Sequence, residues 1–215
     1  MKNKISYPSL RWRYFIGLFL IGLFYHSFPM QAQVAFMAGM NYSDIRNETF
    51  MPGKKGMFGS RLGFSVQYQP FRCAERISVI NEFNYEQRGY RQHLDQTYKR
   101  RFDYLTFSVL MDYKLVKSVS LQGGVEFAGL VKSNIKYWDK TYNDFDFGFV
   151  FGTEFKIMRK ISVAPKLTYG LLPMLDYYDI DEMGTFRKNI HDLRNITWSV
   201  GLKFYLYNEK IKLYN

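Results

Sequence analysis

The segment Tyr142–Ile157, YNDFDFGFVFGTEFKI, alternates between two kinds of residue and so constrains the local fold strongly. Phenylalanines and Ile157 occupy one set of alternate positions, with Thr153 as the only polar member. Glycine, Val150 and charged residues occupy the other set. A period of two places these sets on opposite faces of a β-strand, whereas a helix would require a period near 3.6. The segment therefore predicts a long strand with one aromatic face.

The same alternation recurs along most of the chain and predicts eight strands. We expect them at residues 34–44, 57–69, 77–90, 102–116, 119–132, 142–157, 161–172 and 195–207. Bulky apolar residues on one face and glycine and charge on the other are typical of strands that cross an outer membrane. A soluble lipocalin-like barrel also has eight strands, but its bulky apolar residues line the interior. The charged residues of the strands lie on the face opposite the bulky apolar residues, which favours the membrane barrel. The soluble ligand binder stays as an alternative.

The predicted connections alternate in length. Long polar connections cover residues 46–56, 91–101, 133–141 and 174–194, and short links cover 70–76, 117–118 and 158–160. Long outer loops and tight periplasmic turns alternate in this way in outer-membrane barrels. The fold class is thus all-β, an eight-stranded antiparallel transmembrane β-barrel of the up-and-down type. An even strand number then places both termini in the periplasm.

The N-terminal residues have the pattern of an export signal. A basic region with Lys2, Lys4, Arg11 and Arg13 precedes the apolar run Tyr14–Phe28. We expect a cleaved signal peptide at 1–32 and a barrel domain at 33–215. An uncleaved anchor is the alternative, although the run is shorter than the roughly 20 residues of a spanning helix. The single cysteine, Cys73, allows no internal disulfide.

Composition limits the partners. Twenty phenylalanines and 18 tyrosines suit aromatic belts at a membrane interface, and the mean hydropathy of −0.28 does not argue against a barrel. The formal net charge of +11 could indicate nucleic acid, but the basic residues are scattered rather than gathered in one stripe. Attraction to anionic lipid or lipopolysaccharide is therefore the better interpretation, and we expect no nucleic-acid partner.

Several segments occur in the order and spacing of a known family. They are AGMNYSDI (38–45), NEFNYEQRG (81–89), DYLTFSVLMDY (103–113), FDFGFVFGTEF (145–155) and LTYGLL (167–172). Together they resemble the PorT-like outer-membrane β-barrel family of the Bacteroidota. The resemblance implies an outer-membrane barrel, and it suggests envelope or secretion-system proteins as partners, because the founding member is implicated in assembling the type IX secretion system.

Charged residues on the inner face predict an ion-pair network in the lumen. They are Arg61, Glu82, Glu86, Arg88, Glu126, Glu154, Lys166 and Lys203. The interior of an eight-stranded barrel is just wide enough to be filled by side chains, so these groups must meet and pair. The network either closes the barrel or leaves a narrow ion or proton path. A solute-passing porin would use about twice as many strands.

Basic and aromatic residues are expected at the outer membrane boundary. Lys99, Arg100 and Arg101 lie at the base of the second long connection, where they could contact lipopolysaccharide phosphates or form an ordinary charged collar. Aromatic residues expected in a girdle are Tyr104, Tyr137, Trp138, Tyr142, Tyr177 and Tyr178. The individual sequence of residues 177–194 is where a specific function would lie.

No pattern of catalytic residues is visible, so we expect no enzyme and no cofactor. His93 and His191 are the histidines after the predicted signal, and the adjacent His191 and Asp192 point apart on an extended backbone. Acidic residues in the last long connection lack the spacing of a calcium loop, so no metal site is predicted, although calcium bridging to lipopolysaccharide stays open. The sequence favours a non-enzymatic barrel that binds through loops or turns. The alternatives are a closed structural barrel and a small lipid A-modifying enzyme.

Overall fold

The computed structural model describes residues 32–46, 53–70, 76–93, 96–135, 142–180 and 186–206. For residues 176–180 and 186–192 it describes the backbone alone. Residues 1–31 of the predicted signal peptide, and also Cys73, Tyr137 and Trp138, lie outside these ranges. No helix in the described ranges is long and apolar enough to cross a membrane.

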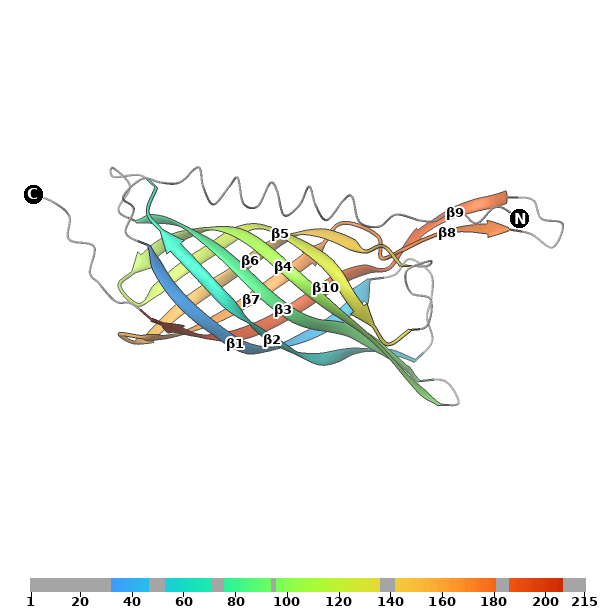
Figure 1. The fold of residues 1–215 in the computed structure, drawn as a ribbon, viewed down its shortest axis with the longest axis horizontal. Helices are drawn as coiled ribbons and strands as arrows, with labels where there is room; N and C mark the ends of the chain where they lie inside the picture. Colours follow the sequence, from blue (N-terminus) through green and yellow to red (C-terminus); the bar gives the residue numbers. More distant parts are fainter. Residues whose placement is uncertain are drawn as a thin grey trace, which may run out of the picture. The chain divides into compact units, whose positions relative to one another are not determined.

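Eight strands close into an antiparallel barrel in the order β1-β10-β7-β6-β5-β4-β3-β2 (Figure 1). They are β1 (Gln33–Arg46), β2 (Lys54–Tyr68), β3 (Ile77–His93), β4 (Thr97–Val116), β5 (Val119–Ser133), β6 (Phe145–Met158), β7 (Ile161–Gly170) and β10 (Arg194–Tyr205). Successive barrel strands pair with each other, β7 pairing with β10, and β1 pairs with β10 to close the ring, which leaves no free edge. The predicted eight-stranded up-and-down barrel is confirmed.

The sequence predicts a long polar loop at 174–194, but this connection contains two strands. It contains β8 (Leu175–Ile180) and β9 (Phe186–Asp192), which pair with each other in a separate two-stranded sheet. The hairpin lies beyond the barrel wall (Figure 1). Because its strands are not part of the barrel wall, they do not need the alternation of apolar and polar residues by which the barrel strands were found.

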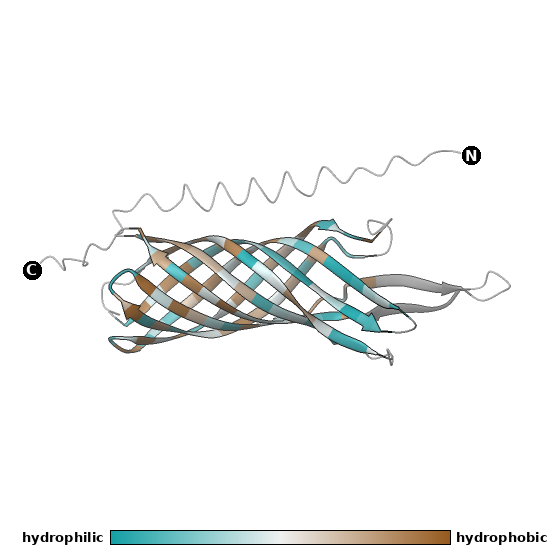
Figure 2. Ribbon diagram, turned by 90° about the horizontal axis from the view of Figure 1, so that it is seen from below, coloured by the Kyte–Doolittle hydropathy of each residue, from teal (hydrophilic) through white to brown (hydrophobic). Residues whose placement is uncertain are grey.

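The two faces of the barrel wall differ sharply in polarity. Phe151 and Trp198 on the outer face are 59% and 60% exposed, whereas Glu82 on the inner face is fully buried. Hydrophobic and hydrophilic residues alternate along the strands, and the strand ends at one end of the barrel are mostly hydrophilic (Figure 2). A lipocalin-like barrel would bury its bulky apolar residues inside, so this arrangement contradicts the soluble alternative.

A row of phenylalanines runs across the outer wall. Its members are successive cross-strand partners from β10 to β6: Phe204, Phe36, Phe64, Phe83, Phe107, Phe127 and Phe147. Ring centroids are 5.0 Å apart for Phe64 and Phe83 and 4.7 Å apart for Phe83 and Phe107, with the rings stacked. Directly opposed aromatic residues stabilise neighbouring strands. We call this set the phenylalanine row.

The two ends of the barrel have different connections. Tight turns at Lys117–Ser118 and Arg159–Lys160 lie at one end, where the Leu206 amide also donates to the Val34 carbonyl (2.9 Å). The first and last described strands therefore begin and end here, at the short-turn end. The longer connections and the β8–β9 hairpin lie at the opposite, long-loop end.

Candidate functional site

The centre of the lumen is organised around one carboxylate. Glu82 of β3 pairs with Lys166 of β7 (2.5 Å), Arg61 of β2 (3.0 Å) and Lys203 of β10 (3.1 Å). All four side chains are buried. Because buried charge is tolerated only when it is paired, three cations around one anion also need further acidic partners.

Toward the long-loop end, those partners are Glu86 and Glu126. The Arg61 Nε lies 3.0 Å from Glu86 Oε1, and Arg88 donates to the other oxygen of Glu86 (2.7 Å) and to Glu126. Ser108 donates to Glu126 (3.1 Å). Charge alternates along this chain of contacts, which spans β2 to β5.

Toward the short-turn end, the partner is Glu154. Lys203 lies 2.9 Å from it, and Gln122 donates to the same oxygen (2.9 Å). Its other oxygen accepts hydrogen bonds from Ser162 (2.8 Å) and Tyr205. Gln122 continues the network to Asp112 (3.1 Å), which also accepts from Ser120 (2.6 Å) and Ser78 (3.2 Å).

The structure thus brings all eight sequence-predicted lumen residues into one connected network. It adds neutral partners on the same inward positions of the strands, among them Gln122, Ser162 and Tyr205. The alternation of inward and outward positions along each strand could have identified these residues as inward-facing. It could not have shown that they contact the charged residues, because the strands that meet in the lumen are far apart in the sequence. Chemically, the network fills the lumen with fixed, mutually compensated charge.

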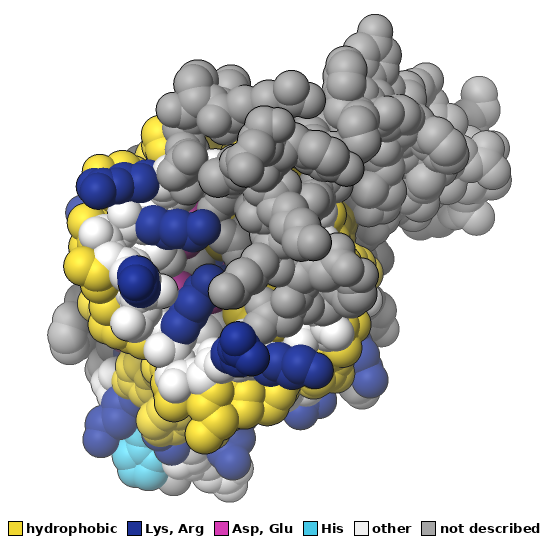
Figure 3. All heavy atoms as spheres, turned by 90° about the vertical axis from the view of Figure 1, so that its left-hand side faces the viewer, with side chains coloured by type: hydrophobic (Ala, Val, Ile, Leu, Met, Phe, Trp, Pro, Cys, Tyr) yellow, Lys and Arg dark blue, Asp and Glu magenta, His cyan; other side chains and the backbone are white. Residues whose placement is uncertain are grey.

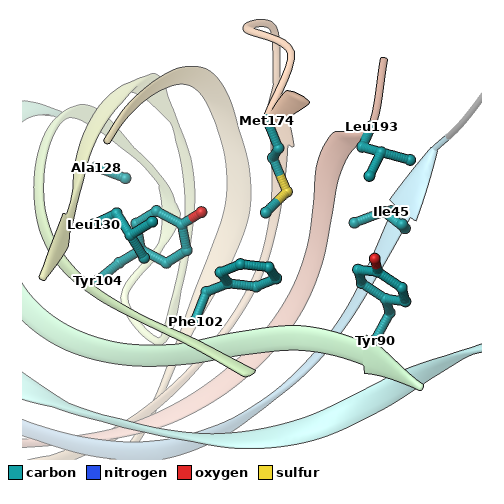
Figure 4. Close-up of a cluster of buried hydrophobic side chains, with 8 residues drawn as sticks. All are labelled: Ile45, Tyr90, Phe102, Tyr104, Ala128, Leu130, Met174 and Leu193. Atoms are coloured by element: carbon teal, nitrogen blue, oxygen red, sulfur yellow. The ribbon is translucent and has the colours of Figure 1, made fainter. Parts of the chain in front are cut away.

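An apolar cluster of buried side chains lies inside the barrel at the long-loop end (Figure 4). Its buried members are Ile45, Tyr90, Phe102, Tyr104, Ala128, Leu130, Met174 and Leu193. We call it the apolar cap. The Tyr104 ring also lies 5.4 Å from the guanidinium of Arg88, so the cap rests directly on the ion-pair network.

Two predicted girdle residues belong to this cap instead. Tyr104 is buried inside the barrel, and the half-buried Tyr142 packs against the cap with its ring 5.1 Å from that of Phe102. The prediction was wrong because residue type was given more weight than strand parity. Tyr104 occupies the same alternate positions as the inward Thr106 and Ser108. The side chains of Tyr177 and Tyr178 lie outside the described part of the structure.

The base of the β8–β9 hairpin is built into the apolar cap. The Met174 amide donates to the Leu193 carbonyl (2.7 Å), and the Asn143 amide donates to the Met174 carbonyl (2.8 Å). Leu193 has a φ of 65°, a left-handed conformation that is unfavourable for a branched residue. Its buried side chain in the cap compensates for this strain, so the hairpin is anchored by the closure of the lumen.

The predicted basic triplet divides between the two faces of β4. Lys99 and Arg101 lie on the outer face, whereas Arg100 lies opposite Tyr90 on the inward side. Strand pairing adds Arg91 opposite Lys99, and Lys55 opposite Arg91. We call Lys55, Arg91, Lys99 and Arg101 the outer basic row. Like charges placed side by side destabilise a sheet. Within the row, the Arg101 Nε lies 3.7 Å from a carboxylate oxygen of Asp103. Sequence reasoning missed Lys55 and Arg91 because their neighbours are distant in the chain.

Comparison with known proteins identifies the family. The model of the outer membrane protein beta-barrel domain matches residues 24–176, which is more than half of the chain. The chain belongs to this family. It is therefore an outer-membrane protein. A search with its sequence found no match among the curated proteins.

Solved structures of similar proteins are also outer-membrane barrels. The attachment invasion locus protein Ail of Yersinia pestis is 14% identical, with 82% of this chain and 100% of that chain covered and a TM-score of 0.45. Neisserial surface protein A is 10% identical, with 81% and 98% covered and a TM-score of 0.48. OprG of Pseudomonas aeruginosa is 10% identical, with 82% and 96% covered and a TM-score of 0.43.

Within its described residues, the outer-membrane barrel holds no cluster of three metal-ligating side chains. His93 contacts Thr97 (2.8 Å), and the side chain of His191 lies outside the described part of the structure.

Proposed function

We propose that the protein is a closed, non-enzymatic outer-membrane barrel that acts by binding through its loops and turns. The observation that carries this proposal is the double closure of the lumen, by the ion-pair network and by the apolar cap. A barrel filled in this way has no room for a solute path. The parts left to act are the two ends, and the long-loop end carries the additional β8–β9 hairpin.

We place the long-loop end outside the cell and both termini in the periplasm, as is usual for bacterial barrels with short turns. The outer basic row would then lie at the level of the lipopolysaccharide phosphates. Arginine and lysine form charge-assisted hydrogen bonds with phosphate, which would relieve the repulsion among the four cations. A contact between this row and lipopolysaccharide is accordingly part of the proposal.

Binding of the refolded protein to purified lipopolysaccharide tests this contact. We expect Lys55→Gln with Arg91→Gln and Lys99→Gln to weaken binding at least about tenfold, because three phosphate contacts are lost. Ser60→Ala, at an exposed position of β2, changes no charge and contacts no member of the row through its side-chain hydrogen bond to Gln87, so it serves as the control. Equal affinities of the triple variant and the parent would contradict the lipopolysaccharide contact.

The resemblance to the PorT-like barrels of the Bacteroidota supports a more specific role in type IX secretion. A deletion strain tests it by comparison of secreted and periplasmic proteomes with those of the parent. Accumulation in the periplasm of proteins with a type IX sorting domain is the expected result. Intact export of these proteins would remove the secretion role and leave the binding function.

The non-enzymatic character has its own test. Mass analysis of lipid A from the deletion strain should give the same profile as the parent. A lost or shifted lipid A species would instead favour the lipid-modifying alternative.

A further inference from the structure

The rim of the barrel at the short-turn end is strongly basic. Six cationic side chains lie there: Arg76, Lys114, Lys117, Lys156, Arg159 and Lys160. Lys114 is half-buried and the others are exposed. The acidic side chains that the structure describes at this end, Asp112 and Glu154, are buried. The rim therefore presents positive charge to solvent without exposed acidic residues among its described neighbours.

Three of these cations occupy lumen-facing positions rather than lipid-facing ones. Lys114 follows the inward Asp112 by two residues, and Lys156 follows the inward Glu154 by two residues. Lys160, in the turn before β7, is joined through its backbone carbonyl to the inward Tyr205 of β10. We call Lys114, Lys156 and Lys160 the mouth lysines. Lys156 confirms this placement, because its Nζ lies 5.8 Å from the ring centroid of the inward-facing Tyr205. Figure 3 shows basic side chains over the opening, inside a ring of hydrophobic ones.

The mouth lysines are held by the ends of the sheet. The Lys114 amide donates to the Arg76 carbonyl (2.9 Å), and the Lys156 amide donates to the Ser118 carbonyl (2.8 Å). The Lys160 carbonyl accepts from the Tyr205 amide (2.9 Å). These bonds connect neighbouring strands around the rim, so the backbone positions of the cations are fixed relative to one another.

The buried carboxylates beneath do not neutralise them. Glu154 already pairs with Lys203 (2.9 Å), and Asp112 accepts hydrogen bonds from neutral serine and glutamine side chains. In the described part of the barrel, no ion pair joins either carboxylate to a mouth lysine. The positive field at the mouth is thus available to a ligand from outside the barrel.

We propose that the mouth lysines bind an acidic segment of a protein partner in the compartment that the short turns face. Leu115 and Ile157 are exposed on the outer wall at this end, so lipid would lie against that wall rather than over the axis of the barrel. The mouth opens to water, so its natural ligand is a soluble polyanion with closely spaced carboxylates. This inference rests on the proposed binding function and specifies the kind of partner that the short-turn end binds.

The test uses the protein refolded into nanodiscs of neutral phosphatidylcholine, with a fluorescent oligoglutamate peptide as the probe. We expect binding that disappears between roughly 0.05 and 0.5 M salt, because exposed charges are screened over this range. Lys114→Gln with Lys156→Gln and Lys160→Gln should lower the affinity at least about tenfold. If the triple variant does not fold, Lys156→Gln alone should lower it about threefold.

The variant of the outer basic row is a matched control, because it removes the same charge at the other end. Its affinity for the peptide should be within about twofold of the parent's affinity. The variant of the mouth lysines should keep the parent's affinity for lipopolysaccharide. Equal losses in both variants would attribute peptide binding to net charge and overturn the proposal. Absence of peptide binding would overturn it while leaving lipopolysaccharide binding untouched.

Discussion

At the scale of single residues, Glu82 has the most demanding environment. It is fully buried and compensates three cations from three other strands. Replacing a buried, hydrogen-bonded charge leaves its partners uncompensated, which usually costs more than the pair contributed. The lumen network should therefore depend on this residue more than on any peripheral member.

We predict that Glu82→Gln lowers the free energy of unfolding by about 3–5 kcal/mol, because Lys166, Lys203 and Arg61 lose a shared counter-ion. Urea unfolding in lipid vesicles, followed by tryptophan fluorescence, measures the change. Combining Glu82→Gln with Lys166→Met removes one charge of each sign and should recover part of the loss. A loss under about 1 kcal/mol in the single variant would contradict the account of the network.

Leu193 connects the strained backbone at the hairpin base with the apolar cap. Leu193→Gly would relieve a strain of about 1 kcal/mol but remove a buried side chain worth more. We expect the base of the hairpin to become sensitive to protease while the barrel keeps its heat-modifiable gel mobility. Leu172→Ala, at a more exposed site nearby, is the control. Protease resistance equal to the parent would show that the cap does not hold the hairpin.

At the scale of elements, the phenylalanine row joins neighbouring strands through stacked rings. Phe107 contacts two members of the row, Phe83 at 4.7 Å and Phe127 at 6.5 Å. Phe107→Leu keeps an apolar surface but loses both ring pairs, so we predict a loss of about 1–2 kcal/mol in unfolding free energy. Phe151→Leu is the matched control, because no stacked ring faces Phe151 among the described residues. Equal effects of the two variants would refute a contribution from stacking.

The barrel strands could be predicted from sequence because lipid and lumen impose opposite requirements on alternate residues. The run around Phe149 identified a strand and its faces without any knowledge of its neighbours. The hairpin could not be predicted in this way, because β8 and β9 satisfy no lipid-facing pattern. The candidate sites could be predicted from the sequence only in part. Parity identified the inward charges, whereas the row made by Lys55, Arg91 and Lys99 depends on strand pairing between distant segments.

At the scale of the whole molecule, the barrel is closed inside and charged at both ends. The cations at the long-loop end lie on the outer wall, whereas the mouth lysines lie over the lumen opening. On the proposals above, the first arrangement would face the surrounding lipid and the second would face the aqueous compartment of the short turns. One rigid barrel could therefore hold an outer-leaflet ligand and an acidic partner at the same time.

The most direct test of this account is the electrical conductance of the refolded protein in a planar lipid bilayer. Because the ion-pair network and the apolar cap fill the lumen, we predict no sustained current at moderate voltage. Stable open-channel steps that are abolished by unfolding the protein would contradict the closed barrel, and with it the proposal that the protein works through its ends.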